Sequence, residues 1–251
     1  MKKIVLAACL LTSLSAKAQF IEAGVHVGYG TTWLINNNVS DQGANLDPAT
    51  SFGTTFGIHG GYYFPSRLGI VVEIDYAIVN QKYTGKNSFL SYDVKDRLNF
   101  IELPILLRKY SPGGFYFEVG PKFSFLTGAT ETLESSPAFP LDYEDRDIAA
   151  GHTKTIVSAA FGIGGHFPIG KNLYADARLR FAYGFSDATV KFSEAELTQK
   201  TLEQEIGVGT YYAHRTQQGQ YSYKNTNLAT GHVMAGLSYR IPAQKKSSAI
   251  R

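Results

Sequence analysis

The feature that most constrains the fold is an alternation of apolar and polar residues with a period of two, which recurs along almost the whole chain. In the first such segment, Ile21, Ala23, Val25 and Val27 alternate with Glu22 and with other polar residues or glycine. A period of two places successive side chains on opposite faces of a β-strand. Eight segments of this kind follow one another between residues 20 and 241, so the pattern predicts an all-β chain of eight strands.

The connections between these segments alternate in length. Three are short and contain proline, glycine or asparagine, at residues 65–67, 111–114 and 168–172. Four are long, at residues 34–51, 84–97, 128–153 and 186–228. Short turns on one side and long loops on the other are typical of outer-membrane barrels. We therefore expect an eight-stranded antiparallel up-and-down transmembrane β-barrel with both ends on the periplasmic side of the cell outer membrane.

The orientation of the apolar face separates two kinds of eight-stranded barrel. A soluble, lipocalin-like barrel turns this face inward, whereas a membrane barrel turns it toward lipid. The polar face here is rich in glycine, which suits a narrow lumen where small residues make room for large ones. Aromatic residues also gather at the short-turn ends, as an interfacial belt requires. The residues assigned to this belt are Phe20, Tyr62, Phe64, Tyr110, Phe115, Phe167, Tyr174 and Tyr239.

The N-terminus has the pattern of a signal peptide. Two lysines precede an apolar stretch over residues 4–11, and Ala16-Lys17-Ala18 provides a cleavage site. A lipoprotein signal ending at Cys9 is the alternative, but the apolar run before it is short. The expected organisation is a signal peptide over 1–18, a barrel over 19–241 and a polar periplasmic tail over 242–251. Cleavage after Ala18 removes the one cysteine of the chain, and with it disulfide and thiolate chemistry.

The face assignment also predicts which charges lie in the lumen. Five carboxylates and five cations alternate with apolar residues and therefore point inward. Unpaired charges in a narrow, poorly hydrated interior are costly, so we expect these groups to form an ion-pair network that closes the lumen. The predicted network consists of Glu73, Asp75, Glu102, Glu118 and Asp176 with Arg108, Lys122, Arg178, Arg180 and Arg240.

Four segments have distinctive sequences: residues 99–108 (NFIELPILLR), 117–122 (FEVGPK), 162–167 (GIGGHF) and 174–178 (YADAR). They resemble, in this order, the fourth, fifth, sixth and seventh strands of the PorT-type outer-membrane barrels of Bacteroidetes. The resemblance implies the fold and the location, and it implies a role in type IX protein secretion more weakly, since most relatives have no known role. One departure is the polar tail after Ile241, where such barrels often end on an aromatic residue.

The sequence offers little for catalysis. His152, His214 and His232 are expected near the loop-side rim, but no histidine belongs to a known catalytic or zinc-binding motif. The acidic residues Asp142, Glu144, Asp145 and Asp147 match no calcium-loop spacing. We therefore expect neither an enzyme nor a bound metal or cofactor. The net charge of +3, without a Lys/Arg-rich run, also argues against nucleic-acid binding.

Two functional hypotheses remain. The first is a structural or accessory barrel in the outer-membrane lipid that acts through secretion or envelope proteins. The second is a small selective pore or a ligand-binding barrel. The fourth long loop is the most individual segment: residues 195–206 have helix-like composition, and residues 210–214 and 220–224 are expected to form a tyrosine-rich hairpin. The oligomeric state is left open.

Overall fold

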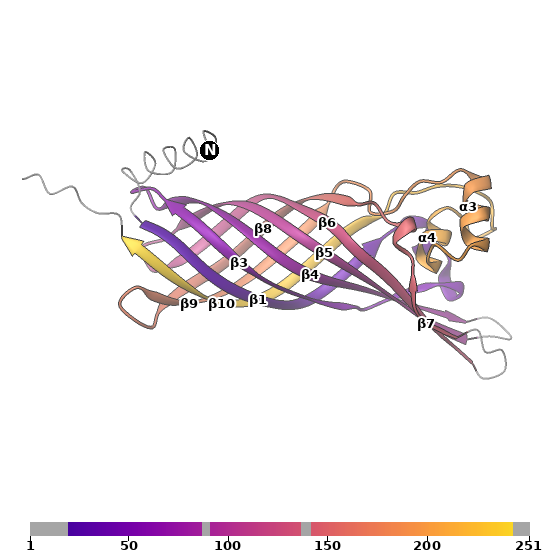
Figure 1. The fold of residues 1–251 in the computed structure, drawn as a ribbon, viewed down its shortest axis with the longest axis horizontal. Helices are drawn as coiled ribbons and strands as arrows, with labels where there is room; N and C mark the ends of the chain where they lie inside the picture. The colour runs from indigo at the N-terminus through magenta and orange to yellow at the C-terminus, as the bar shows by residue number, and fades with distance from the viewer. Residues whose placement is uncertain (1–19, 87–90, 137–141, 243–251) are drawn as a thin grey trace, which may run out of the picture.

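The computed structural model describes residues 20–86, 91–136 and 142–242. The expected signal peptide and nearly all of the expected tail lie outside the described residues. Eight long strands form one closed antiparallel barrel (Figure 1). These strands are β1 (Phe20–Ile35), β3 (Phe52–Tyr63), β4 (Leu68–Lys86), β5 (Ser91–Tyr110), β6 (Phe115–Ser135), β8 (Thr155–Pro168), β9 (Leu173–Gly184) and β10 (Asn227–Pro242). The eight-stranded fold predicted from the alternation is confirmed.

The barrel closes through pairing of its first and last strands. β1 and β10 are in register from Phe20 opposite Pro242 to Ile35 opposite Asn227, and β4 pairs with β5 to complete the ring. The three short connections lie at one end of the barrel and the long ones at the other. No helix of the described ranges is long and apolar enough to cross a membrane.

An apolar band surrounds the outside of the barrel. Along β4, every second residue from Leu68 to Ile78 is apolar and points outward, and Leu68, Ile70, Val72 and Ile74 are 38–53% exposed. The outward positions then become polar at Asn80 and Lys82. The apolar stretch has the length that a tilted strand needs to cross the hydrocarbon layer, which is roughly 9–11 residues. The apolar face of the alternation therefore points to the outside of the barrel.

The strands continue well beyond the apolar band, which corrects two of the expected loops. Residues 84–97 and 128–135 lie largely in β4, β5 and β6, and a short strand β7 (Tyr143–Asp147) pairs with β6. Here the outward face meets water and is polar, so the apolar–polar contrast that marks the lower part of each strand is lost. The sequence of a strand in this region therefore looks like a loop.

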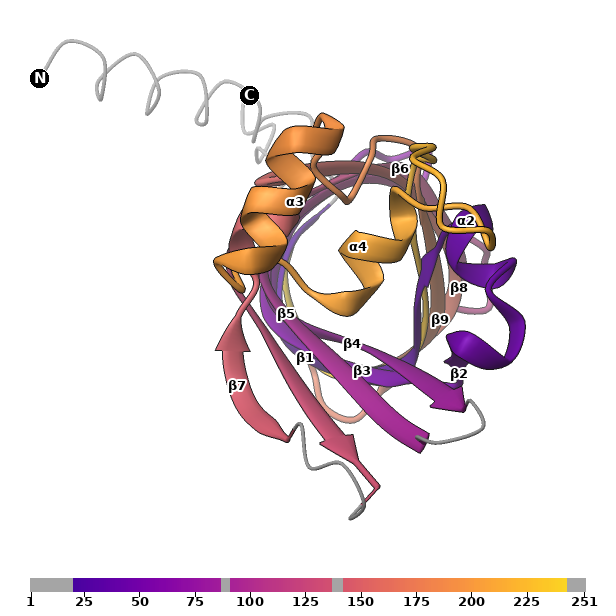
Figure 2. The same cartoon turned by 90° about the vertical axis from the view of Figure 1, so that its right-hand side faces the viewer.

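The remaining connections form a cap over one end of the barrel, here defined as residues 36–51, 142–154 and 185–226. It contains helices α2 (Asn37–Ser40), α3 (Glu194–Leu202) and α4 (Val208–Ala213), the 3-10 turns Gly43–Asn45 and Ala149–Gly151, and strand β2 (Asp47–Ala49). Viewed from this end, α4 lies across the mouth of the barrel (Figure 2). The expected helix near 195–206 is present as α3. The expected hairpin is wrong in its first half, because residues 208–213 are helical.

α3 begins where its sequence favours a helix start. The Ser193 side chain accepts from the backbone N–H of Glu196, and the Glu196 carboxylate accepts from the backbone N–H of Ser193. This reciprocal pair satisfies two N–H groups that a helix start otherwise leaves unpaired. The cap is therefore a folded unit with its own local stabilisation.

We predict that the cap is outside the cell and the short turns are in the periplasm. The exposed residues Gln218 and Lys171 mark the two ends. In a background in which Cys9 is replaced by serine, a single cysteine can be placed at either site. In intact cells a membrane-impermeant maleimide should label Gln218→Cys, and should label Lys171→Cys only after the outer membrane is permeabilised. Equal labelling of both variants in intact cells would reject this topology.

Candidate functional site

The interior of the barrel holds a network of fully buried charges. Arg180 donates to Glu118 Oε1 at 2.6 Å and to Glu73 Oε2 at 2.5 Å. Arg108 donates to Glu118 Oε2 at 2.8 Å, and Arg178 donates to Glu73 Oε1 at 3.0 Å. Two carboxylates from β4 and β6 thus accept from three guanidinium groups of β5 and β9. Such forked contacts between arginine and carboxylate are among the strongest hydrogen bonds in proteins.

Glu22 extends this network to the seam between β1 and β10. Its Oε2 accepts from Arg240 Nε at 2.8 Å, and its Oε1 lies 3.4 Å from the NH1 group of Arg108. Asp176 accepts from the Tyr116 hydroxyl at 2.7 Å and lies 2.8 Å from His166 Nε2. We refer to Glu22, Glu73, Asp75, Glu118, Asp176, Arg108, Arg178, Arg180 and Arg240, with His26, His59 and His166, as the lumen network.

Glu102 and Lys122 form a separate pair. Lys122 Nζ and the Ser124 hydroxyl each donate to Glu102 Oε1 at 2.8 Å. His232 was expected near the rim, but it lies on β10 directly opposite Arg180 of β9. All ten predicted charges therefore lie on the inner face, eight of them in the lumen network and two in this pair. Glu22 and the three histidines of the lumen network were not predicted as members of it, although the alternation places them on the polar face.

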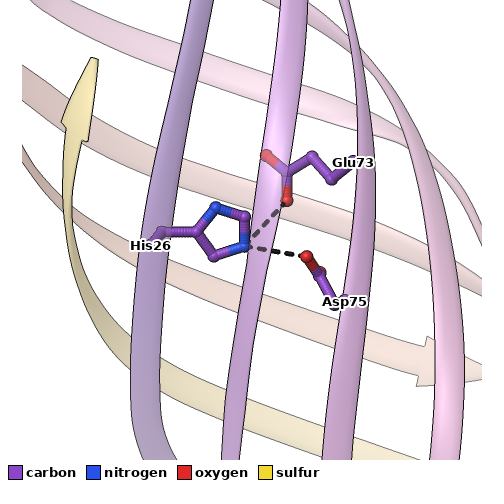
Figure 3. A group of neighbouring side chains, drawn as sticks. All are labelled: His26, Glu73 and Asp75. Carbon is purple, nitrogen blue, oxygen red and sulfur yellow. Dashed lines mark hydrogen bonds and ion pairs between the residues drawn. The ribbon is translucent and has the colours of Figure 1, made fainter.

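Counting Glu22, the lumen network and the Glu102–Lys122 pair together contain six carboxylates against five lysine and arginine side chains. Asp96 of β5 and Glu131 of β6 are also buried, opposite each other nearer the cap. His26 Nε2 lies 2.8 Å from Asp75 Oδ1 and 3.6 Å from Glu73 Oε2, so this histidine of β1 joins two carboxylates of β4 (Figure 3).

His26, Glu73 and Asp75 also bring three potential metal-ligand atoms within 4.8 Å of one another. Both oxygens of Glu73 already accept from arginine, Oε1 from Arg178 and Oε2 from Arg180. A divalent cation at this point would displace those bonds and be repelled by the guanidinium groups. The geometry at Glu73 therefore does not fit a metal ion. In the described residues no comparable cluster is formed by the acidic segment 142–147.

The short-turn end of the lumen is closed by aromatic rings. Tyr63, Tyr110 and Tyr116 are buried and pack against one another at tilted and edge-to-face angles, with ring centroids of successive pairs 5.2 and 5.3 Å apart. The Arg240 guanidinium lies over the rings of Phe20, Tyr110 and Tyr174 at 4.1–4.8 Å.

This arrangement corrects the expected aromatic belt. Phe20, Tyr110 and Tyr174 face the lumen, because the alternation of inward and outward positions continues to the strand ends. Phe115, Phe167 and Tyr239 are at least half exposed on the outside, and Tyr62 and Phe64, partly exposed, stack edge to face.

Toward the cap, an apolar plug fills the lumen. It consists of Leu34, Ala77, Val79, Leu98, Phe100, Ala129, Ile148, Ile156, Ala188 and Leu228, all buried. These residues come from six barrel strands around the ring and from two segments of the cap. Several side chains of the plug are completely inaccessible to water, as are the side chains of Glu73 and Arg108. The plug and the lumen network therefore leave no water-accessible passage along these residues.

His214 holds the cap together. Its Nδ1 lies 2.9 Å from the carbonyl oxygen of Thr210, to which it donates, and its Nε2 accepts from the backbone N–H of Phe192 at 3.0 Å. Its ring packs on Tyr223 at 4.5 Å. Both nitrogens are used by the neutral ring, and burial lowers the pKa of His214. Burial also lowers the pKa of His152, at the base of the cap, to about 4. Of these two expected rim residues, His214 therefore has a structural role within the cap, and His152 is buried beneath it.

The cap also contains a pocket of about 460 Å³ between β6, β7 and the α3–α4 segment. Its wall is formed by aromatic and apolar side chains with one cation, Arg146, whose guanidinium stacks on Tyr143 at 3.9 Å. The lining includes Tyr92, Leu133, Tyr143, Ile206, Tyr211 and Tyr212. The size is within the range of small-molecule sites.

A closed barrel with an apolar outer band and a polar, charge-paired interior defines a transmembrane β-barrel of the outer-membrane class. A family model described as outer membrane protein beta-barrel domain matches residues 15–190. The chain belongs to this family, and its location is the outer membrane. No match was found among curated protein sequences.

Solved outer-membrane barrels are similar over most of their length. The outer membrane protein OprG from Pseudomonas aeruginosa is 11% identical, with 90% of this chain and 98% of that chain covered and a TM-score of 0.42. AlkL, solved in DMPC bilayers, is 13% identical, with 94% of each chain covered and a TM-score of 0.41. Neisserial surface protein A is 11% identical, with 88% and 97% covered and a TM-score of 0.38. Similarity at this level carries no information on function.

Removing one partner of a buried pair should destabilise the barrel. Glu102→Ala leaves Lys122 without a carboxylate and should lower the free energy of unfolding by about 3–5 kcal/mol. The double variant Glu102→Ala, Lys122→Ala removes both charges and should lose less. Both can be measured by urea unfolding in detergent. A single variant as stable as the wild type would show that the pair is well hydrated.

Acidification should loosen the cap and leave the barrel intact. His214 and His152 bind a proton more weakly in the folded cap than in the unfolded chain, where the ordinary pKa is 6.5. The unfolded segment therefore gains protons first, so cap stability is full above pH 6.5 and falls as the pH drops from there toward 4. Hydrogen exchange of α4 amides, corrected for intrinsic rates, should increase over this range. His214→Phe should weaken the dependence, and pH-independent protection in the wild type would contradict the assignment.

Proposed function

We propose that this protein is a closed outer-membrane barrel that acts as a structural or accessory component through partners, and that it does not conduct solutes freely. The observation that carries the proposal is the filled lumen. The lumen network, the aromatic rings below it and the apolar plug above it occupy three successive levels of the interior. In an eight-stranded barrel the interior is only wide enough for side chains. The side chains at each level are therefore enough to close it.

The cap is the part of the molecule best suited to meet a partner. It is folded, it lies beyond the apolar band, and it presents partly exposed tyrosines such as Tyr211 and Tyr212. Tyrosine supplies a large contact area at low cost in conformational entropy, which favours recognition.

A PorT-type assignment and a role in type IX secretion are finer proposals, and they rest on the resemblance alone. The motif residues Glu102, Arg108, Glu118 and Lys122 supply charges to the barrel interior. Shared residues of this kind specify how a barrel is filled, so they support the fold more strongly than the secretion role.

The pocket in the cap favours a second candidate function, a ligand-binding barrel. Its aromatic wall and single guanidinium suit a ligand that combines an apolar or planar body with a negative or polar group. In this version the barrel anchors the pocket at the cell surface, and the lumen is still closed.

The closed lumen predicts little steady conductance in planar bilayers. A triple variant, Phe100→Ala, Glu118→Ala, Arg180→Ala, shortens side chains in the plug and in the lumen network. Once inserted, it should conduct more than the wild type, which shows that the assay detects openings. The outward-facing pair Ile101→Ala, Ile105→Ala is the matched control and should behave like the wild type. Large, stable openings of the wild-type barrel would favour the selective-pore hypothesis.

A further inference from the structure

Three exposed cations lie together on the outside of the barrel, just beyond the apolar band. They are Lys82 on β4 and Lys95 and Arg97 on β5. Lys82 is directly opposite Lys95, and Arg97 is opposite Asn80. None of the three has a carboxylate within 4.0 Å in the described part of the chain, whereas the buried cations of the lumen are paired.

The spacing of this cluster is set by the sheet. Directly opposed residues on neighbouring antiparallel strands have Cβ atoms about 5 Å apart, and diagonal neighbours are about 7–8 Å apart. Lys82 and Lys95 are therefore the closest pair, with Arg97 completing a triangle on one face. Like charges directly opposite one another destabilise a sheet. An anion between the three side chains removes that repulsion.

The height of the cluster places it among lipid headgroups. On β5 the outward positions are apolar at Leu107, Ile105, Leu103 and Ile101, then polar at Asn99, Arg97 and Lys95. Each residue rises roughly 3.3 Å along a strand, and lysine and arginine extend further toward an interface with their apolar stems. The headgroup layer of a bilayer begins where the apolar band ends.

We propose that Lys82, Lys95 and Arg97 form a binding site for the phosphate groups of an anionic lipid headgroup in the leaflet on the cap side. The guanidinium of Arg97 suits bidentate contact with phosphate oxygens, and the two ammonium groups supply point charges. The neighbouring hydroxyl groups of Thr130 and Thr132, opposite Arg97 and Lys95 on β6, add hydrogen-bond donors.

Acidic residues border the site on its upper side, and Asp147 of β7 lies beside it, opposite Thr130. Asp93 and Glu134 face each other across β5 and β6 one step farther from the membrane than Lys95. Together with Lys82 and Lys95 they line a hollow of about 380 Å³. This arrangement admits an anion from the membrane side and repels one from the solution side. It favours a lipid phosphate over a dissolved one.

The test uses the complete mature barrel in nanodiscs of phosphatidylcholine, titrated with lipid A or with dephosphorylated lipid A. Bound lipid is measured by native mass spectrometry. The variant Lys82→Gln, Lys95→Gln, Arg97→Gln should bind lipid A about a hundredfold more weakly, since each basic residue contributes about 1 kcal/mol at an anionic surface. The wild type should bind dephosphorylated lipid A about as weakly as the triple variant binds lipid A.

The matched control removes three exposed charges elsewhere: Lys86→Gln, Lys109→Gln, Lys171→Gln. It should bind lipid A like the wild type. An equal loss in both triple variants would mean that only the net charge matters and would overturn the site. Displacement of lipid A by inorganic pyrophosphate as effective as by lipid A itself would overturn the lipid assignment, because the cluster would then be a site for a soluble anion. Both triple variants alter only exposed side chains, so their unfolding midpoints should be close to that of the wild type. This measurement checks that a loss of lipid binding is not caused by unfolding.

Discussion

The constraint on which the rest of the structure depends is the satisfaction of backbone hydrogen bonds inside the hydrocarbon. A strand edge exposed to lipid leaves N–H and C=O groups unpaired at a cost of several kcal/mol each, so a sheet in a membrane must close on itself. In this chain closure is made by β1 and β10, in register over their whole length. Once eight strands close, the diameter of the lumen is fixed, and the side chains inside must fit it.

That narrow lumen explains why so many charges are compatible with a stable barrel. Carboxylates and guanidinium groups from opposite walls reach one another, as Glu73 and Arg180 do at 2.5 Å. Glycines such as Gly57 and Gly120 stand where a Cβ atom would collide with the backbone or a side chain of the next strand. The interior is thus specialised for closure. The parts of the protein available to other molecules are the cap and the outer surface.

The sequence predicted the fold and the inward charges because both follow from parity along a strand. Glu73 and Arg180 are placed on the inner face by residue number alone. The same parity placed Phe20, Tyr110 and Tyr174 inside, and their assignment to the outer belt was wrong because aromatic residues at strand ends were grouped by position and not by face. Specific pairings could not be predicted. Asp176 meets His166 because the register of β8 and β9 places them directly opposite each other, and it meets Tyr116 of β6 across the ring; alternation encodes neither. The upper parts of β4 and β5 were not predicted as strands. Water surrounds them, so their outward positions are polar and the alternation is lost.

The contact between Glu22 and Arg240 has a consequence for how the barrel is made. These residues are 218 positions apart and sit directly opposite each other on the first and last strands. Contacts between the ends of a chain are the slowest to form, because the whole intervening segment must be organised first. Until then Glu22 is a carboxylate on an open edge, and Arg240 lacks its partner. The Glu22–Arg240 ion pair therefore forms only when the ring of strands is complete. An incomplete barrel would carry these two charges unpaired at its open edges, where they oppose release into lipid before closure.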